Sequence, residues 1–125
     1  MKRIVANTFR ELVPEEDDAS RHGWASIQDA MDLELDHEKV FWNEYLCLGM
    51  RIDSWLIPKP LLVAHLRQAE QAVLDKKGLE KLSKKAKAEL KIMVLRKLRK
   101  QLVPSTKMVD LVWNTRTHVA RFFSQ

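Results

Sequence analysis

Residues 45–57 read Tyr-Leu-Cys-Leu-Gly-Met-Arg-Ile-Asp-Ser-Trp-Leu-Ile, a run rich in apolar, aromatic and β-branched side chains. In its second half the side chains fall into two alternating sets, one containing Met50 and Ile52 and the other containing Arg51 and Asp53. A period of two is typical of a β-strand, whose successive side chains point to opposite faces of a sheet. We therefore predict a strand in this stretch, which Pro58 ends.

Two helices are predicted directly after this strand. Apolar side chains recur at helical spacing between residues 61 and 74, and Pro60 stands near the first turn, where proline is favoured. Gly78 follows this helix at a position that suits a left-handed C-cap, and Ser83 can cap a second helix that runs to about Leu102. Because the connection is short, we predict an antiparallel helical hairpin over residues 58–103.

The two ends of the chain complete the predicted fold. Pro14 precedes the four acidic residues 15–18, so residues 1–20 form an N-terminal segment and a solvated acidic loop. Gly23 opens a short strand over residues 23–27, within a strand region of residues 21–57. Two β-rich runs flank the polar residues 114–117 and predict a β-hairpin over residues 107–124. The fold class is α+β, with antiparallel strands, a long helical hairpin and a C-terminal β-hairpin, in a single domain or a fragment of a larger protein.

Composition limits the class of protein further. The 125 residues are 46% hydrophobic and 31% charged, as in a globular protein. Cys47 is the only cysteine, so no internal disulfide can form, and a reducing, cytoplasmic setting is expected. No secretory signal and no apolar run of membrane-spanning length is visible, so we expect no membrane partner.

Charge is distributed unevenly along the chain. Residues 1–44 hold five basic and eleven acidic side chains, whereas residues 76–107 hold twelve basic side chains and only two acidic ones. Concentrated Lys and Arg commonly neutralise phosphates, and a solvated helix face is the alternative use of such a segment. We predict DNA-backbone contacts from eight residues of the second helix: Lys84, Lys85, Lys87, Lys91, Arg96, Lys97, Arg99 and Lys100.

Other candidate sites are weaker. The four histidines have no helical pairing or cysteine partner that would build a zinc site, and the three glycines are too far apart to form a phosphate-binding loop. The alternation of Asp32, Glu34, Asp36 and Glu38 could hold a metal ion but is more often a solvated strand or loop. We therefore expect no catalytic residues, no cofactor, no metal and no small-molecule substrate.

Aromatic and thiol side chains are expected to be structural. Trp24, Trp42, Trp55 and Trp113 could stack on bases, but each lies beside apolar residues, which favours core packing. Cys47 lies in an apolar run and is expected to be a buried, inert thiol.

The order of these elements resembles the recombination-associated RdgC family of bacterial DNA-binding proteins. The resemblance rests on Gly23-Trp24 opening a strand and on Ile57-Pro58-Lys59-Pro60 leading into a long helix. It continues with the Lys-rich helix that ends at Leu102-Val103-Pro104, and with the strand Val109-Asp110-Leu111-Val112-Trp113. It covers most of the chain from Arg21 onward and matches the interior of longer family members.

The resemblance implies DNA binding with little sequence preference, a nucleoid-associated location and a link to the control of recombination and replication. Family members form ring-shaped dimers around a positive central hole, and a terminal strand with an open edge also allows a homodimer. No individual binding residue is carried over from the family, so the eight basic residues rest on charge and helical position alone.

Two alternatives to DNA binding remain open. The first is an assembly domain in which the acidic N-terminal third of one chain docks on the basic helix of another. The second, weaker alternative is a metal-dependent nuclease.

Overall fold

A computed structural model describes residues 1–124. Their contacts form two compact units. The sheet unit contains residues 1–12, 19–54 and the chain from Ser105 onward, and the helical unit contains residues 13–18 and 55–104. The prediction of an α+β fold with a helical pair and C-terminal antiparallel strands is confirmed.

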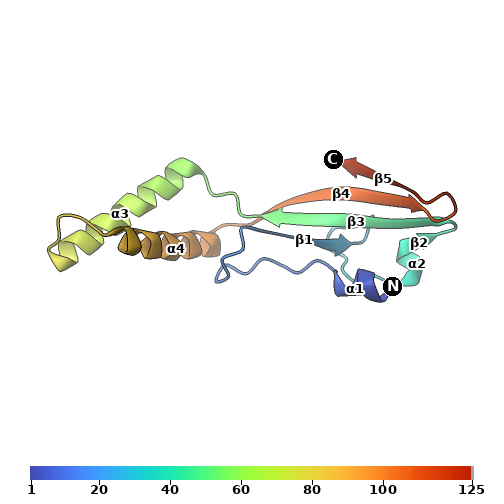
Figure 1. The fold of residues 1–125 in the computed structure, drawn as a ribbon, viewed down its shortest axis with the longest axis horizontal. Coiled ribbons are helices and arrows are strands. Elements are labelled where there is room, and N and C mark those ends of the chain that lie inside the picture. The colour runs from blue at the N-terminus through green and yellow to red at the C-terminus, as the bar shows by residue number, and fades with distance from the viewer. Residues whose placement is uncertain (125) are drawn as a thin grey trace. The chain divides into compact units, whose positions relative to one another are not determined.

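One antiparallel sheet organises the sheet unit, with the strand order β1-β3-β4-β5 (Figure 1). The short strand β2 (Phe41–Trp42) lies off this path and pairs with β3. The longest strands are β3 (Tyr45–Ser54) and β4 (Ser105–Asn114), which pair along their whole lengths from Tyr45↔Asn114 to Ser54↔Ser105. The outer strands are β1 (Ser20–Ala25) and β5 (Val119–Ser124).

The core of the sheet unit lies on one face of β3 and β4. Leu46, Leu48 and Leu111 are buried there with Leu35 and Val40 from the preceding segment. Two short helices, α1 (Lys2–Ala6) and α2 (His37–Val40), belong to the same unit. Their lengths of five and four residues are too short to give a helical period in the sequence, which is why neither was predicted.

The strand predicted over residues 23–27 lies earlier, at Ser20–Ala25, with Gly23 inside it. The N-terminal segment explains the need for glycine. The Phe9 N–H donates to the Trp24 carbonyl and the Trp24 N–H donates to the Asn7 carbonyl, at 3.0 Å each. A Cβ at Gly23 would overlap the backbone of Phe9. Gly23 therefore permits the backbone of residues 7–9 to lie against the strand in a parallel bridge, rather than opening the strand.

The predicted strand over residues 45–57 ends at Ser54, and its polar set is buried rather than solvated. The Arg51 guanidinium donates to both carboxylate oxygens of Asp53 at 3.0 and 3.1 Å and to the Ala30 carbonyl at 3.2 Å. The Thr106 hydroxyl donates to Asp53 at 2.8 Å, and the ring of Phe9 lies 4.1 Å from the guanidinium carbon. Four separate segments therefore meet at one buried ion pair.

The helical unit follows its sequence signals closely. Helix α3 is Lys59–Lys77 and helix α4 is Lys84–Gln101. Gly78 adopts the left-handed conformation at the C-cap of α3, with φ 64°, and the Ser83 hydroxyl accepts from the Ala86 N–H at 3.2 Å. Both predicted caps are confirmed.

The C-terminal hairpin also forms as predicted. The Asn114 side-chain oxygen accepts from the Arg116 and Thr117 N–H groups, and the left-handed His118 completes the turn. The outer edge of β5 has no strand partner among residues 1–124.

We predict that Asp53→Ala lowers the free energy of unfolding by about 3 kcal/mol, because it leaves the buried Arg51 without its partner. The double variant Arg51→Met/Asp53→Leu should lose much less, since it removes both buried charges. Urea unfolding followed by circular dichroism gives both values. An Asp53→Ala variant as stable as the original protein would contradict a structural role for the pair.

Candidate nucleic-acid interface

The net charge of the protein resides in the helical unit. This unit holds thirteen basic and eight acidic residues, which leaves +5, whereas the sheet unit holds nine of each. All eight predicted DNA-contacting residues lie on α4, which carries only one acidic residue, Glu89. The positive electrostatic potential of the protein is therefore expected around the helical unit.

Three of the eight residues form an uninterrupted stripe. Lys84, Lys87 and Lys91 are spaced i, i+3 and i+7, so they share one side of α4. All three side chains are exposed, as is Lys85 beside them. We call Lys84, Lys87 and Lys91 the lysine stripe.

The lysine stripe is unfavourable for the isolated helix. Lys84, Lys85 and Lys87 crowd the first turn, where the helix dipole is positive, and that turn contains no acidic residue. Like charges three and four residues apart also repel one another along the helix. A solvated face on which charges of both signs alternate would not carry these costs.

The end of α4 has a different environment, because the acidic loop of residues 15–18 contacts it. The Arg96 Nε and Nη2 atoms donate to the two carboxylate oxygens of Asp17, at 3.2 Å each. The Lys100 Nζ lies 3.6 Å from a carboxylate oxygen of Glu15. These pairs lie on the surface, with side chains between 44% and 62% exposed. Arg96 and Lys100 therefore already have anionic partners within the chain.

Arg99 and Lys97 occupy two further environments. Arg99 is only 7% exposed, and its Nη1 donates to the Glu16 carbonyl at 2.9 Å, so it holds the loop rather than facing solvent. Lys97 lines a hollow of about 250 Å³ with His65 and Gln68 of α3. Lys84, Lys85, Lys87 and Lys91 thus form one exposed set, Lys97 is exposed beside the hollow, and Arg96, Arg99 and Lys100 contact the acidic loop.

Two of the four carboxylates considered for a metal, Asp32 and Asp36, have other partners. Asp32 pairs with Lys39 at 3.0 Å, and this contact lowers the pKa of Asp32 and raises that of Lys39. Asp36 caps α2 by accepting from the Lys39 N–H. Within residues 1–124, no group of three or more candidate ligands is arranged to hold a metal ion.

The aromatic side chains divide between core and surface. Trp24 packs against the core of the sheet unit, as predicted, but Trp42 and Trp113 are 48% and 39% exposed. Burial raises the pKa of the half-buried Cys47 thiol, which favours the unreactive protonated form.

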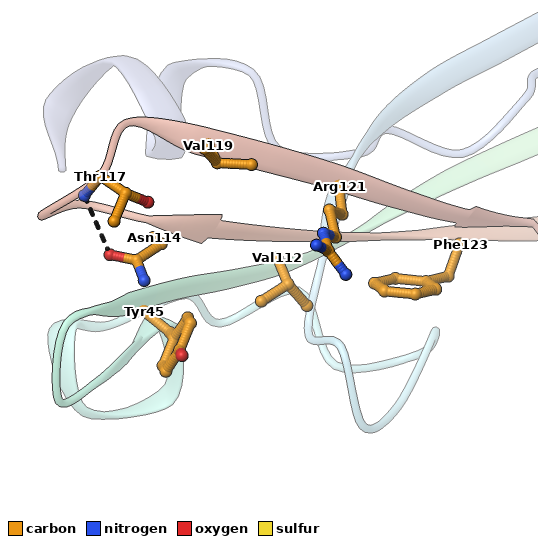
Figure 2. A pocket seen from close by; sticks show the side chains of 7 residues that line it. All are labelled: Tyr45, Val112, Asn114, Thr117, Val119, Arg121 and Phe123. Atoms are coloured by element: carbon orange, nitrogen blue, oxygen red, sulfur yellow. Dashed lines mark hydrogen bonds between the residues drawn. The ribbon is translucent and has the colours of Figure 1, made fainter.

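A shallow hollow of about 480 Å³ lies on the sheet face formed by β3, β4 and β5 (Figure 2). Figure 2 shows Arg121 and Phe123 side by side on β5, with Val112 of β4 and Tyr45 of β3 along the same face. Its lining is mainly apolar with one cation.

Sequence reasoning missed the contact between the acidic loop and α4 within one chain. Asp17 and Arg96 are 79 residues apart, and no local period links them. The available signal was the opposite charge of two segments, which could not distinguish pairing within a chain from pairing between chains.

No helix in the described part of the chain combines the length and apolar character needed to cross a membrane. No family model matches the sequence, and no curated protein matches it.

Proposed function

We propose that this protein binds the DNA backbone without sequence preference, through the lysine stripe of α4 and the adjacent Lys85. One observation carries the proposal: three lysines crowd the first turn of α4, where they destabilise the free helix. Phosphates would relieve this repulsion, and the counterions that they release would drive binding.

The mode of contact follows from the chemistry of lysine. An ammonium group on a flexible stem neutralises a phosphate as a point charge and carries little geometric information about bases. The exposed stripe has no planar bidentate donor, because Arg96 and Arg99 both contact the acidic loop. Phosphate contacts therefore dominate, and a role in recombination or replication would use this sequence-independent affinity.

The alternative proposal is an assembly domain that joins the acidic segment of one chain to the basic helix of another. Within a single chain, Asp17 and Glu15 already contact Arg96 and Lys100. Exchange between chains would break these pairs to form equivalent ones, so it yields little net electrostatic gain. This favours DNA over assembly as the use of the basic surface.

We predict that binding to duplex DNA weakens steeply with salt and depends little on sequence. Fluorescence anisotropy with duplexes of two unrelated sequences, titrated over a range of salt concentrations, measures both properties. Four lysine–phosphate contacts correspond to a slope of roughly −3.6 in the logarithm of affinity against that of salt. Salt-insensitive binding, or strong preference for one duplex, would contradict the proposal.

A second prediction tests the lysine stripe itself. Lys84→Glu/Lys87→Glu/Lys91→Glu should abolish most of the affinity and reduce the salt slope by roughly 2.7, since each phosphate contact contributes about 0.9. The helix should remain folded by circular dichroism, because all three side chains are exposed.

The matched control reverses three exposed cations of the sheet unit: Lys2→Glu/Arg3→Glu/Arg10→Glu. It changes the net charge by the same amount. Equal loss of affinity in the two triple variants would show that total charge, rather than the stripe, determines binding.

A further inference from the structure

We infer that the acidic loop of residues 15–18 is an internal competitor of DNA, which covers the cations at the end of α4 until a phosphate backbone displaces it. This inference rests on the proposed function and assigns a regulation to the same helix.

The first argument is geometric. Asp17 presents two oxygens to the Nε and Nη2 atoms of Arg96, each at 3.2 Å. These two donors form the fork that arginine also offers to two oxygens of a phosphate. The carboxylate therefore occupies the Nε/Nη2 fork of Arg96, and a phosphate can bind that fork only by displacing Asp17.

The second argument concerns strength. The Asp17–Arg96 and Glu15–Lys100 pairs are exposed to solvent, where ion pairs are weak and screened by salt. A DNA backbone adds several phosphates and releases condensed counterions. The pairs are thus strong enough to reduce affinity but too weak to prevent binding.

The third argument concerns what stays in place. Arg99 is buried and donates to the backbone carbonyl of Glu16, a contact that does not depend on any loop carboxylate. The loop backbone can remain anchored while Asp17 and Glu15 turn away from the helix. Displacement therefore requires side-chain movement and no unfolding of α4.

Once DNA displaces the loop carboxylates, Arg96 and Lys100 form a second group of phosphate contacts. Arg96 and Lys100 are four residues apart on one side of α4, so both can face the same polyanion. In the original protein, Arg96 and Lys100 exchange a loop carboxylate for a DNA phosphate, and this exchange releases few counterions. Without the loop carboxylates, they contribute fully to the salt dependence.

The test neutralises the two paired carboxylates in the full chain with Glu15→Gln/Asp17→Asn. Affinity for duplex DNA should rise by roughly two- to thirtyfold, the range that two exposed ion pairs can account for. The salt slope should steepen by as much as about 1.8, from two additional phosphate contacts. Anisotropy titrations with the same labelled duplex measure both changes.

Two control variants test whether the gain in DNA affinity comes from the loop carboxylates, rather than from the change in net charge or in side-chain shape. Glu34→Gln/Glu38→Gln makes the same change in net charge at exposed positions outside the acidic loop and should leave affinity within about twofold, because it keeps the Asp17–Arg96 and Glu15–Lys100 pairs intact. Glu15→Asp/Asp17→Glu keeps the charge and should bind more like the original protein than like the neutralised variant.

Each outcome has one meaning. If the original protein binds DNA and Glu15→Gln/Asp17→Asn binds it with the same affinity, the acidic loop does not compete with DNA. The proposed function is then unaffected. An equal gain in the Glu34→Gln/Glu38→Gln control also overturns the inference that the loop competes with DNA. Absence of binding in every variant overturns the proposed function together with this inference, whereas binding gained only on neutralising the loop supports both.

Discussion

The pairing of β3 with β4 is the constraint on which the rest of the structure depends. These strands pair from Tyr45↔Asn114 to Ser54↔Ser105, although residues 55–104 separate them in the sequence. Because the entropy cost of closing a loop grows only slowly with its length, a long insertion between paired strands is tolerated. The insertion leaves β3 and enters β4 at one end of the ladder, and its two helices, α3 with 19 residues and α4 with 18, belong to the helical unit.

The Arg51–Asp53 and Arg96–Asp17 ion pairs have the same chemistry but different roles, because the first is buried and the second is exposed. Arg51 and Asp53 are 7% and 5% exposed in their side chains; Arg51 also donates to the Ala30 carbonyl, and Asp53 accepts from the Thr106 hydroxyl. Such a pair cannot open without leaving a buried charge, so it is structural. The Arg96–Asp17 pair keeps 44% and 62% of its side chains exposed, and water can replace either partner. Burial therefore decides which arginines are fixed and which can change partners.

The parts of the fold that depend on neighbouring residues could be predicted from the sequence. Gly78 and Ser83 cap their helices as expected because capping involves only the adjacent turn. The alternation at Arg51 and Asp53 indicated a strand but not that its polar face is buried, since Phe9, some 40 residues earlier, covers it. The candidate site divides in the same way. The charge and helical position of the residues predicted eight candidate cations on the second helix, whereas the burial of one of them, Arg99, depends on a loop far away in the sequence.

The two ends of α4 differ in how well their cations are satisfied. At the C-terminal end, Arg96 and Lys100 have carboxylate partners and also lie near the negative end of the helix dipole. At the N-terminal end, Lys84 and Lys87 repel each other and face the positive end of the same dipole. If DNA binds as proposed, its phosphates gain more free energy at the lysine stripe than at the paired end, where each cation already has a carboxylate partner.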